Sequence, residues 1–155
     1  MSQSYSSNSS SDSSAPSSSL AKSPNRLVAT IFGVVYLLVG LLGFAYTGGV
    51  EFFDTEGGLL LGIFEVNPFH NVAHLLIGAA LLIAGLKSVP AARSANIAVG
   101  AAYLLLGIIG LFLVDSPANI LAINGADNVL HFGSAILLLA VGLGADKHHR
   151  RSTAR

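Results

Sequence analysis

Cysteine is absent from this chain of 155 residues. Its absence excludes disulfides, thiolate nucleophiles, iron–sulfur clusters and cysteine-based zinc sites. Charge is also scarce, at 10% of residues against about 25% in a typical soluble globular protein. Hydrophobic residues make up 52%. Because so few charges cannot cover a water-facing surface, the composition predicts a protein that faces the lipid bilayer.

An excess of either sign of charge is missing as well, since eight Lys and Arg balance eight Asp and Glu. Without a basic field there is nothing to attract nucleic acid, and we expect no nucleic-acid partner. No catalytic motif stands out along the chain. We therefore expect a protein that is not an enzyme.

The N-terminal segment is of low complexity, with twelve serines among its first nineteen residues. Such a segment cannot bury enough apolar area to offset the entropy of ordering. We expect residues 1–25 to form a disordered tail and residues 145–155 a short basic tail. The serines are either part of a solvated leader or phosphorylation sites. A secretory signal is not favoured, because the apolar stretch starts only after Arg26.

Four apolar stretches of about twenty residues lie between the tails, each long enough to cross the roughly 30 Å hydrocarbon core. They predict an all-α, four-helix transmembrane bundle over residues 26–144, with spans at about 27–46, 67–86, 95–114 and 124–143. Asn67 is a favourable N-cap, followed by Pro68 at the first helical position. The short apolar stretches 59–64 and 120–123 are expected at the outer interface.

The distribution of charge predicts the orientation. Residues 27–86 and 94–146 contain no Lys or Arg, so every basic residue falls in the N-terminal tail, in the 87–94 loop or in the C-terminal tail. With four spans these segments share one side. The positive-inside rule makes that side cytoplasmic, which places both termini there and predicts a multi-pass protein of the plasma membrane. The acidic residues of the other connections then lie outside.

The two halves of the chain also match each other. One set of residues recurs at an offset of 67: Arg26, Gly33, Tyr36, Gly40 and Gly43 match Arg93, Gly100, Tyr103, Gly107 and Gly110. A second set recurs at an offset of 57: Asn67, Asn71, Val72, His74 and Gly85 match Asn124, Asn128, Val129, His131 and Gly142. Each repeat holds two spans, so both sit the same way up. We expect two repeated helical hairpins related by a pseudo-two-fold axis along the membrane normal.

Three stretches carry a resemblance to a known family: FGVVYLLVGLLGF (32–44), VNPFHNVAHLLIG (66–78) and NGADNVLHFGSA (124–135). From Asn25 to Leu143 the chain resembles the bacterial membrane-protein family catalogued as domain of unknown function 4383. The resemblance implies a four-span bacterial membrane protein. It implies no activity, cofactor or catalytic residue, and it does not include the serine-rich leader.

Polar side chains recur inside the predicted second and fourth spans: Asn67, Asn71 and His74, with their copies Asn124, Asn128 and His131. Each set has i, i+4, i+7 spacing and shares one helix face. The histidines lie about 10 Å below the outer boundary. One interpretation is interhelical hydrogen bonding, worth roughly 0.6 kcal/mol per contact. The other is a functional site near the pseudo-axis, because polar groups at this depth usually face the bundle interior or a cavity.

Two specific functions would use these histidines. Haem ligation by His74 and His131 needs two imidazoles on different helices, which the repeat supplies. A proton or small-solute pathway would add Glu65 and Asp127. We expect no bound metal and no catalytic residue. His70 is expected near the surface and solvated.

The remaining membrane residues of note are glycines and tyrosines. The glycines Gly33, Gly40, Gly43, Gly100, Gly107 and Gly110 are expected to pack helices closely. Tyr36 and Tyr103 lie mid-span and each hydroxyl needs a partner. Helical side chains lean toward the helix N-terminus, so we expect the tyrosines to lean away from the histidines.

Three hypotheses for the function stay open at this level. The first is a non-enzymatic membrane protein that acts through packing, a homo-oligomer or a membrane-protein partner. The second is a haem-bearing or redox membrane subunit. The third is a small-solute or proton pathway.

The predicted topology is testable by cysteine labelling, since the native chain offers no background thiol. A cysteine introduced at Ser88 should resist a membrane-impermeant maleimide in intact cells and react after the cells are opened. Labelling of that cysteine from outside the intact cell would refute a cytoplasmic 87–94 segment.

Overall fold

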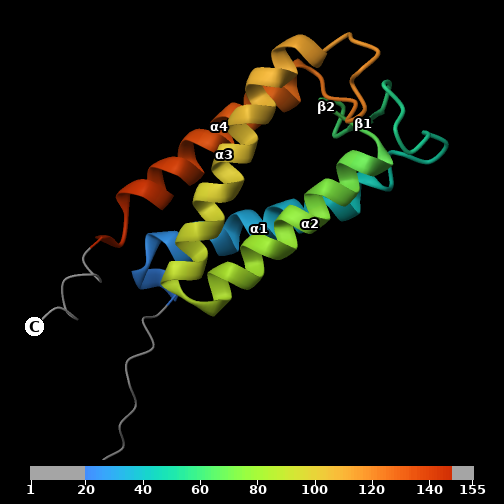
Figure 1. Cartoon of the computed structure of the whole chain (residues 1–155). Helices are drawn as coiled ribbons and strands as arrows, with labels where there is room; N and C mark the ends of the chain where they lie inside the picture. The colour runs from blue at the N-terminus through green and yellow to red at the C-terminus, as the bar shows by residue number, and fades with distance from the viewer. Residues whose placement is uncertain (1–19, 148–155) are drawn as a thin grey trace, which may run out of the picture.

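The computed structural model describes residues 20–147, and four helices dominate them (Figure 1). A short 3-10 helix, η1 (Leu20–Lys22), leads into α1 (Pro24–Gly43). After a connection containing strands β1 (Gly58–Leu60) and β2 (Phe64–Val66) come α2 (Pro68–Lys87), α3 (Val89–Leu113) and α4 (Gly125–Gly144). All four helices are long and apolar enough to cross a membrane. The prediction of an all-helical membrane protein with four spans is confirmed to that extent.

Side-chain caps decide where the helices begin. Ser23 accepts a hydrogen bond from the backbone N–H of Arg26, and Asn67 accepts one from His70. Ser88 does the same for α3, while Asn124 forms a capping box with Asp127 at the start of α4. Such side chains satisfy backbone donors that the first turn leaves open. Each cap therefore fixes a helix start that hydropathy alone does not define.

The boundaries differ from the predicted ones in three places. Residues Leu20–Lys22 and the start of α1 at Pro24 are ordered, although they fall within the tail expected to be disordered. Residues 1–19 and 148–155 lie outside the described residues. The expected 87–94 loop is reduced to Ser88, because that residue ends α2 and caps α3 at once. The 59–64 stretch belongs to a β-hairpin, in which Leu60 pairs with Phe64.

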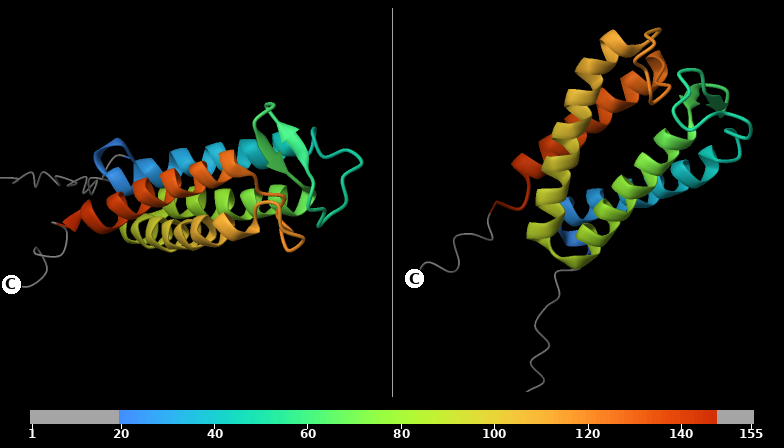
Figure 2. Two further views of the ribbon diagram at one scale, coloured as in Figure 1. Left: turned by 90° about the horizontal axis from the view of Figure 1, so that it is seen from above. Right: turned by 45° about the vertical axis from the view of Figure 1, so that its right-hand side comes forward.

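The helices pack as two pairs, α1 with α2 and α3 with α4 (Figures 1 and 2). The pairs approach each other where α2 passes into α3 and diverge toward the opposite end, as the right-hand view of Figure 2 shows. We call the first end the basic end, since it carries the described basic residues Lys22, Arg26, Lys87, Arg93 and Lys147. The opposite end, with the β-hairpin and the 114–124 connection, is the acidic end.

Glycine brings the helices of each pair into close contact. A Cβ on Gly33 would lie 2.5 Å from the backbone nitrogen of Leu82, and a Cβ on Gly40 would lie 2.9 Å from the Asn71 carbonyl oxygen. In the second pair, a Cβ on Gly100 would lie 2.9 Å from Leu139 Cγ. No larger residue fits between such close backbones. These glycines are thus contact points within each pair.

The remaining predicted packing glycines occupy the same kind of position. Gly107 faces the ring of Phe132 at 3.0 Å from a built Cβ. At Gly43 a Cβ would collide with the side-chain oxygen of Asn71, and at Gly110 with that of Asn128.

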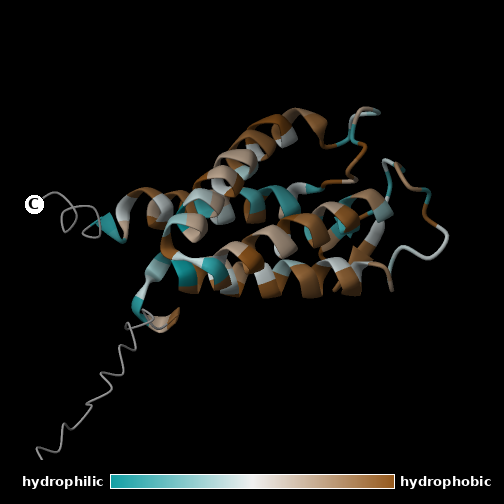
Figure 3. Ribbon diagram, turned by 60° about the horizontal axis from the view of Figure 1, so that its bottom comes forward, coloured by the Kyte–Doolittle hydropathy of each residue, from teal (hydrophilic) through white to brown (hydrophobic). Residues whose placement is uncertain are grey.

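The outer surface of the helices is apolar. Large hydrophobic side chains such as Leu41, Leu76, Ile83 and Phe112 are more than half exposed. Figure 3 shows the hydrophobic colour along the helices and the hydrophilic colour mainly at their ends and connections. A soluble protein rarely exposes so much contiguous apolar surface. The four helices therefore present a surface suited to lipid.

Replacing Gly33 with alanine should destabilise the first helix pair, because the new Cβ meets the backbone of Leu82 and not a movable side-chain end. Overpacking of this kind typically costs about 1–3 kcal/mol. Thermal unfolding in detergent should show a lower midpoint for Gly33→Ala. The matched control is Gly133→Ala on α4, where a Cβ meets nothing within 4 Å. Equal midpoints for both variants would contradict the close contact.

Candidate functional site: a lateral cavity with two histidines

The centre of the molecule holds a cluster of five aromatic and imidazole rings. We call it the five-ring cluster: Tyr36, His70, His74, Tyr103 and His131. Its members come from all four helices, and their centroids form a closed circuit. Tyr36 lies 5.5 Å from His74 and 5.4 Å from Tyr103, which in turn lies 5.3 Å from His131. His70 completes the circuit, at 4.5 Å from His74 and 6.2 Å from His131.

Each tyrosine of the cluster stacks on a histidine of the same helix pair. The rings of Tyr36 and His74 are within 6° of parallel, and those of Tyr103 and His131 within 21°. Although we expect the tyrosines to lean away from the histidines, the two kinds of ring are in contact. No tyrosine–histidine hydrogen bond is present among the described residues, and the flat faces of the rings make the contact instead.

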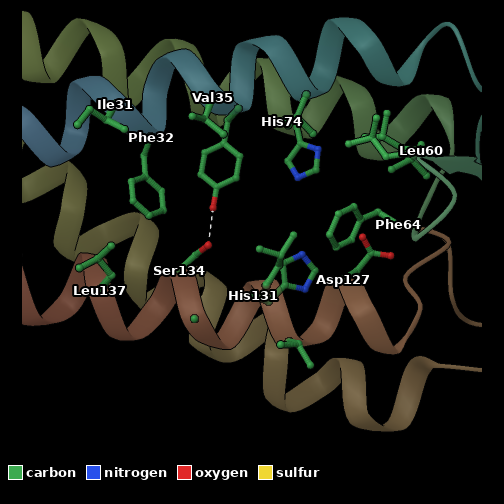
Figure 4. A pocket seen from close by; sticks show the side chains of 17 residues that line it. Ile31, Phe32, Val35, Leu60, Phe64, His74, Asp127, His131, Ser134 and Leu137 are labelled. Carbon is green, nitrogen blue, oxygen red and sulfur yellow. Dashed lines mark hydrogen bonds between the residues drawn. The ribbon is translucent and has the colours of Figure 1, made fainter.

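Tyr36 finds its hydroxyl partner on the other helix pair. Its Oη donates to Ser134 Oγ at 2.7 Å, drawn as the dashed line in Figure 4. Ser134 lies on α4 in an otherwise apolar run and is 7% exposed. The corresponding position of the first repeat is Ile77, so Tyr103 has no equivalent serine to bind. The Tyr36–Ser134 hydrogen bond between α1 and α4 therefore has no counterpart between Tyr103 and Ile77.

A cavity of about 530 Å³ lies beside the five-ring cluster, between α1 and α4 (Figure 4). We call it the lateral cavity. Leu60, Phe64 and Val66 of the β-hairpin close it toward the acidic end. Apolar residues on its rim are strongly exposed, with Val35 at 46% and Leu130 at 50%. Because such residues face lipid in a membrane, the cavity opens sideways toward the bilayer.

Two histidines reach this cavity from opposite sides. Figure 4 shows His74 on α2 and His131 on α4 across the open space. They are 9% and 4% exposed, and the Nδ1 atom of each is buried without a hydrogen-bond partner in the described part of the chain. An unpaired buried polar group costs about 1–3 kcal/mol. Because both Nδ1 atoms are themselves buried, a ligand in the cavity would meet the rest of each imidazole ring.

Asp127 is the acidic residue of the cavity wall. It is 4% exposed, and its Oδ2 accepts from the backbone N–H groups of Asn124 at 3.0 Å and Glu65 at 3.1 Å. Glu65, the other acid considered for a proton pathway, does not line the cavity. Its carboxylate accepts from the N–H of Gly57 at 2.7 Å within the β-hairpin region. The structure thus brings only one of the two carboxylates to the histidines.

The predicted asparagines take two other positions. Asn67 and Asn124 cap their helices and also reach across the molecule: Asn67 Nδ2 donates to Ile120 O and Asn124 Nδ2 to Ile63 O, both at 2.8 Å. Asn71 donates to Thr47 Oγ1 at 3.3 Å, close to Gly43. Asn128 packs against Gly110 in the same way. None of the four lines the lateral cavity.

The predicted exposure of His70 is wrong. The residue was expected to be solvated, but it is 3% exposed and packs on both other histidines of the cluster. One signal was present in the sequence: His70 precedes His74 by four residues, as Asp127 precedes His131, and this spacing puts each pair on one helix face. Ser134 carries no comparable signal, because its partner lies on a different helix pair.

Four apolar helices around a buried ring cluster define a small multi-pass membrane protein. The chain belongs to the family described as Domain of unknown function (DUF4383), whose model matches residues 26–144. The resemblance noted in the sequence is thereby confirmed. No curated protein and no solved structure matches the chain.

Proposed function

We propose that the protein is a non-enzymatic protein of the plasma membrane that binds a partner inside the bilayer at the lateral cavity. The observation that carries the proposal is the pairing of an opening toward lipid with two polar rings, His74 and His131, in an otherwise largely apolar wall. Ligand pockets are commonly apolar with a few convergent polar groups, and they measure about 300–1,000 Å³. The lateral cavity fits that description in volume and in lining.

The proposed orientation places the basic end in the cytoplasm. The described Lys and Arg residues gather there, whereas Glu51, Asp54, Glu56, Glu65 and Asp115 belong to the connections of the opposite end. The positive-inside rule favours this arrangement in a plasma membrane. The lateral cavity then opens in the outer half of the bilayer.

We further propose that the two helix pairs are repeated hairpins related by a pseudo-two-fold axis along the membrane normal. Reciprocal contacts support the axis. Asn67 binds Ile120 while its repeat mate Asn124 binds Ile63, and Ile63 and Ile120 are themselves mates at the offset of 57. In a two-fold arrangement residue i contacts j and j contacts i, which is what these two bonds do.

Contacts within the hairpins support the repeat in the same way. Arg26 Nε donates to the carbonyl of Gly85, and Arg93 Nε to that of Gly142, both at 2.9 Å. These donors and acceptors are mates at the offsets of 67 and 57. The equivalence extends from the basic end to the tyrosine–histidine stacks.

A non-enzymatic role is supported by the hydrogen bonding of Ser134, one of the two hydroxyl-bearing residues that line the cavity. Ser134 accepts from Tyr36 and makes no bond to an imidazole within the described residues. A serine nucleophile requires a base within hydrogen-bond reach. The arrangement suits binding better than acyl transfer.

A pathway through the membrane has weaker support. Between the cavity and the basic end, Leu81 and Leu138 are fully buried, with Phe32, Ile77 and Val99 packed around them. This apolar layer interrupts any polar route along a single chain. Haem ligation by His74 and His131 is the second candidate, favoured by the two imidazoles in the cavity wall. A Soret band in the purified protein that is lost in His131→Ala would replace our proposal with it.

The partner can be trapped by a photoreactive residue at the cavity rim. We expect p-benzoylphenylalanine at Val35 to give a discrete adduct in whole cells, detected as a defined mass increase of the intact protein. Leu41 provides the matched control, since it lies on the same helix, is 61% exposed and does not line the cavity. The same phospholipid-only adducts from both positions would contradict binding at the cavity.

A further inference from the structure

Resting on the proposed binding role, we infer that the lateral cavity takes a membrane quinone: a planar, uncharged, two-carbonyl head with an apolar tail that leaves between α1 and α4. The inference concerns binding only. It depends on the size of the cavity, on the charge of its wall, and on the histidines and flat rings that line it.

Size decides against a protein helix as the occupant. A helix about 10 Å wide and 30 Å long occupies roughly 2,400 Å³, several times the 530 Å³ of the cavity. The β-hairpin also closes the cavity toward the acidic end through Leu60 and Phe64. A helix therefore cannot run through it, whereas a ring-sized head with a tail directed sideways can enter.

Charge decides against an anionic lipid. The cavity wall includes the Asp127 carboxylate, and no Lys or Arg of the described residues lines it. A fatty acid or phosphate head would lie beside this carboxylate without a cation, in a region where an unpaired charge is costly. The head must accordingly be uncharged, or carry a cation that pairs with Asp127.

The histidines favour the uncharged head. A neutral imidazole has one donor and one acceptor nitrogen. It can therefore donate to a quinone carbonyl or accept from the hydroxyl of the reduced quinol. His74 and His131 approach from two sides of the cavity, as the two carbonyls of a quinone require (Figure 4). A cation held at Asp127 alone would make no use of the two imidazoles in the cavity wall.

The rings add a preference for a flat head. Tyr36 and His74 stack within 6° of parallel and both line the cavity. Aromatic groups pack best in stacked or edge-on geometry, with centroids 4.5–7 Å apart. A planar head extends this packing, whereas a glycerol-based head does not. The apolar rim, with Ile31, Val35 and Leu137, then contacts the tail.

The test is a titration of the full chain in phosphatidylcholine nanodiscs with decylubiquinone. The chain contains no tryptophan and four tyrosines, so its emission comes from tyrosine, and Tyr36 in the cavity wall makes part of that emission sensitive to a quinone there. We expect saturable quenching, with a dissociation constant at least tenfold higher in His74→Phe and in His131→Phe than in the native chain. Unsaturable quenching that is equal in all proteins would overturn the inference.

A matched pair of glycine variants separates cavity binding from partition into lipid. Gly133 lines the cavity and Gly144 does not; both lie on α4, are exposed, and would place a Cβ in open space. Gly133→Leu should abolish saturable quenching, and Gly144→Leu should leave it unchanged. Equal binding by the two variants would show that the quinone does not enter the cavity.

Competition identifies the head group without any variant. Palmitate, sphingosine and monoolein supply an anionic, a cationic and an uncharged non-planar head. None should displace decylubiquinone at equal concentration. Displacement by any of them would overturn the quinone assignment, but an adduct at Val35 would still support binding at the cavity. Loss of both the adduct and the quenching would overturn the proposed function as well.

Discussion

The arrangement of this molecule depends on two amide side chains that join the helix pairs at the acidic end. Asn67 and Asn124 each cap a helix and each donate to a carbonyl of the opposite pair, at Ile120 and Ile63. A backbone carbonyl outside a helix needs a hydrogen-bond donor from a side chain or from water. These bonds satisfy two such carbonyls. They also hold the diverging ends of the pairs at a fixed separation.

The basic end is held by a second polar group of contacts. Asn25 Nδ2 and Ser23 Oγ both donate to Asp146 Oδ2 at 2.9 Å, and Asn96 Nδ2 donates to the Asn25 carbonyl at 3.0 Å. The two pairs are thus fixed to each other at both ends. Between the basic end and the acidic end, the space between the two helix pairs is filled by side chains and not by backbone. The middle of the molecule is where space for a ligand can remain.

The two kinds of packing explain why that space exists. Within each pair, glycines such as Gly33 and Gly100 bring backbones into contact, which leaves little room. Between the pairs, large rings of Tyr36 and Tyr103 meet at 5.4 Å and keep the helices apart. The lateral cavity lies beside these rings and includes Tyr36 in its wall. The histidines lie at its wall because Tyr36 and Tyr103 stack against them.

Much of the fold could be predicted from the sequence, because a bilayer forces long uncharged stretches into helices. The prediction located all four. It missed the first turns of α3, since hydropathy does not register the capping by Ser88. It also missed the β-hairpin, which depends on the pairing of two three-residue strands. The site was only partly predictable: the histidines were found from the repeat, whereas Ser134 is defined by Tyr36, 98 residues away.

The most direct test of the account is a side-chain 15N NMR spectrum of His74 and His131 in nanodiscs, assigned with single His→Phe variants. Hydrogen bonding changes the nitrogen shifts of a neutral imidazole. We predict that both residues shift together on saturation with decylubiquinone, and that Gly133→Leu prevents the change. Unaltered shifts of both histidines at saturating quinone would contradict a ligand site formed between the two helix pairs.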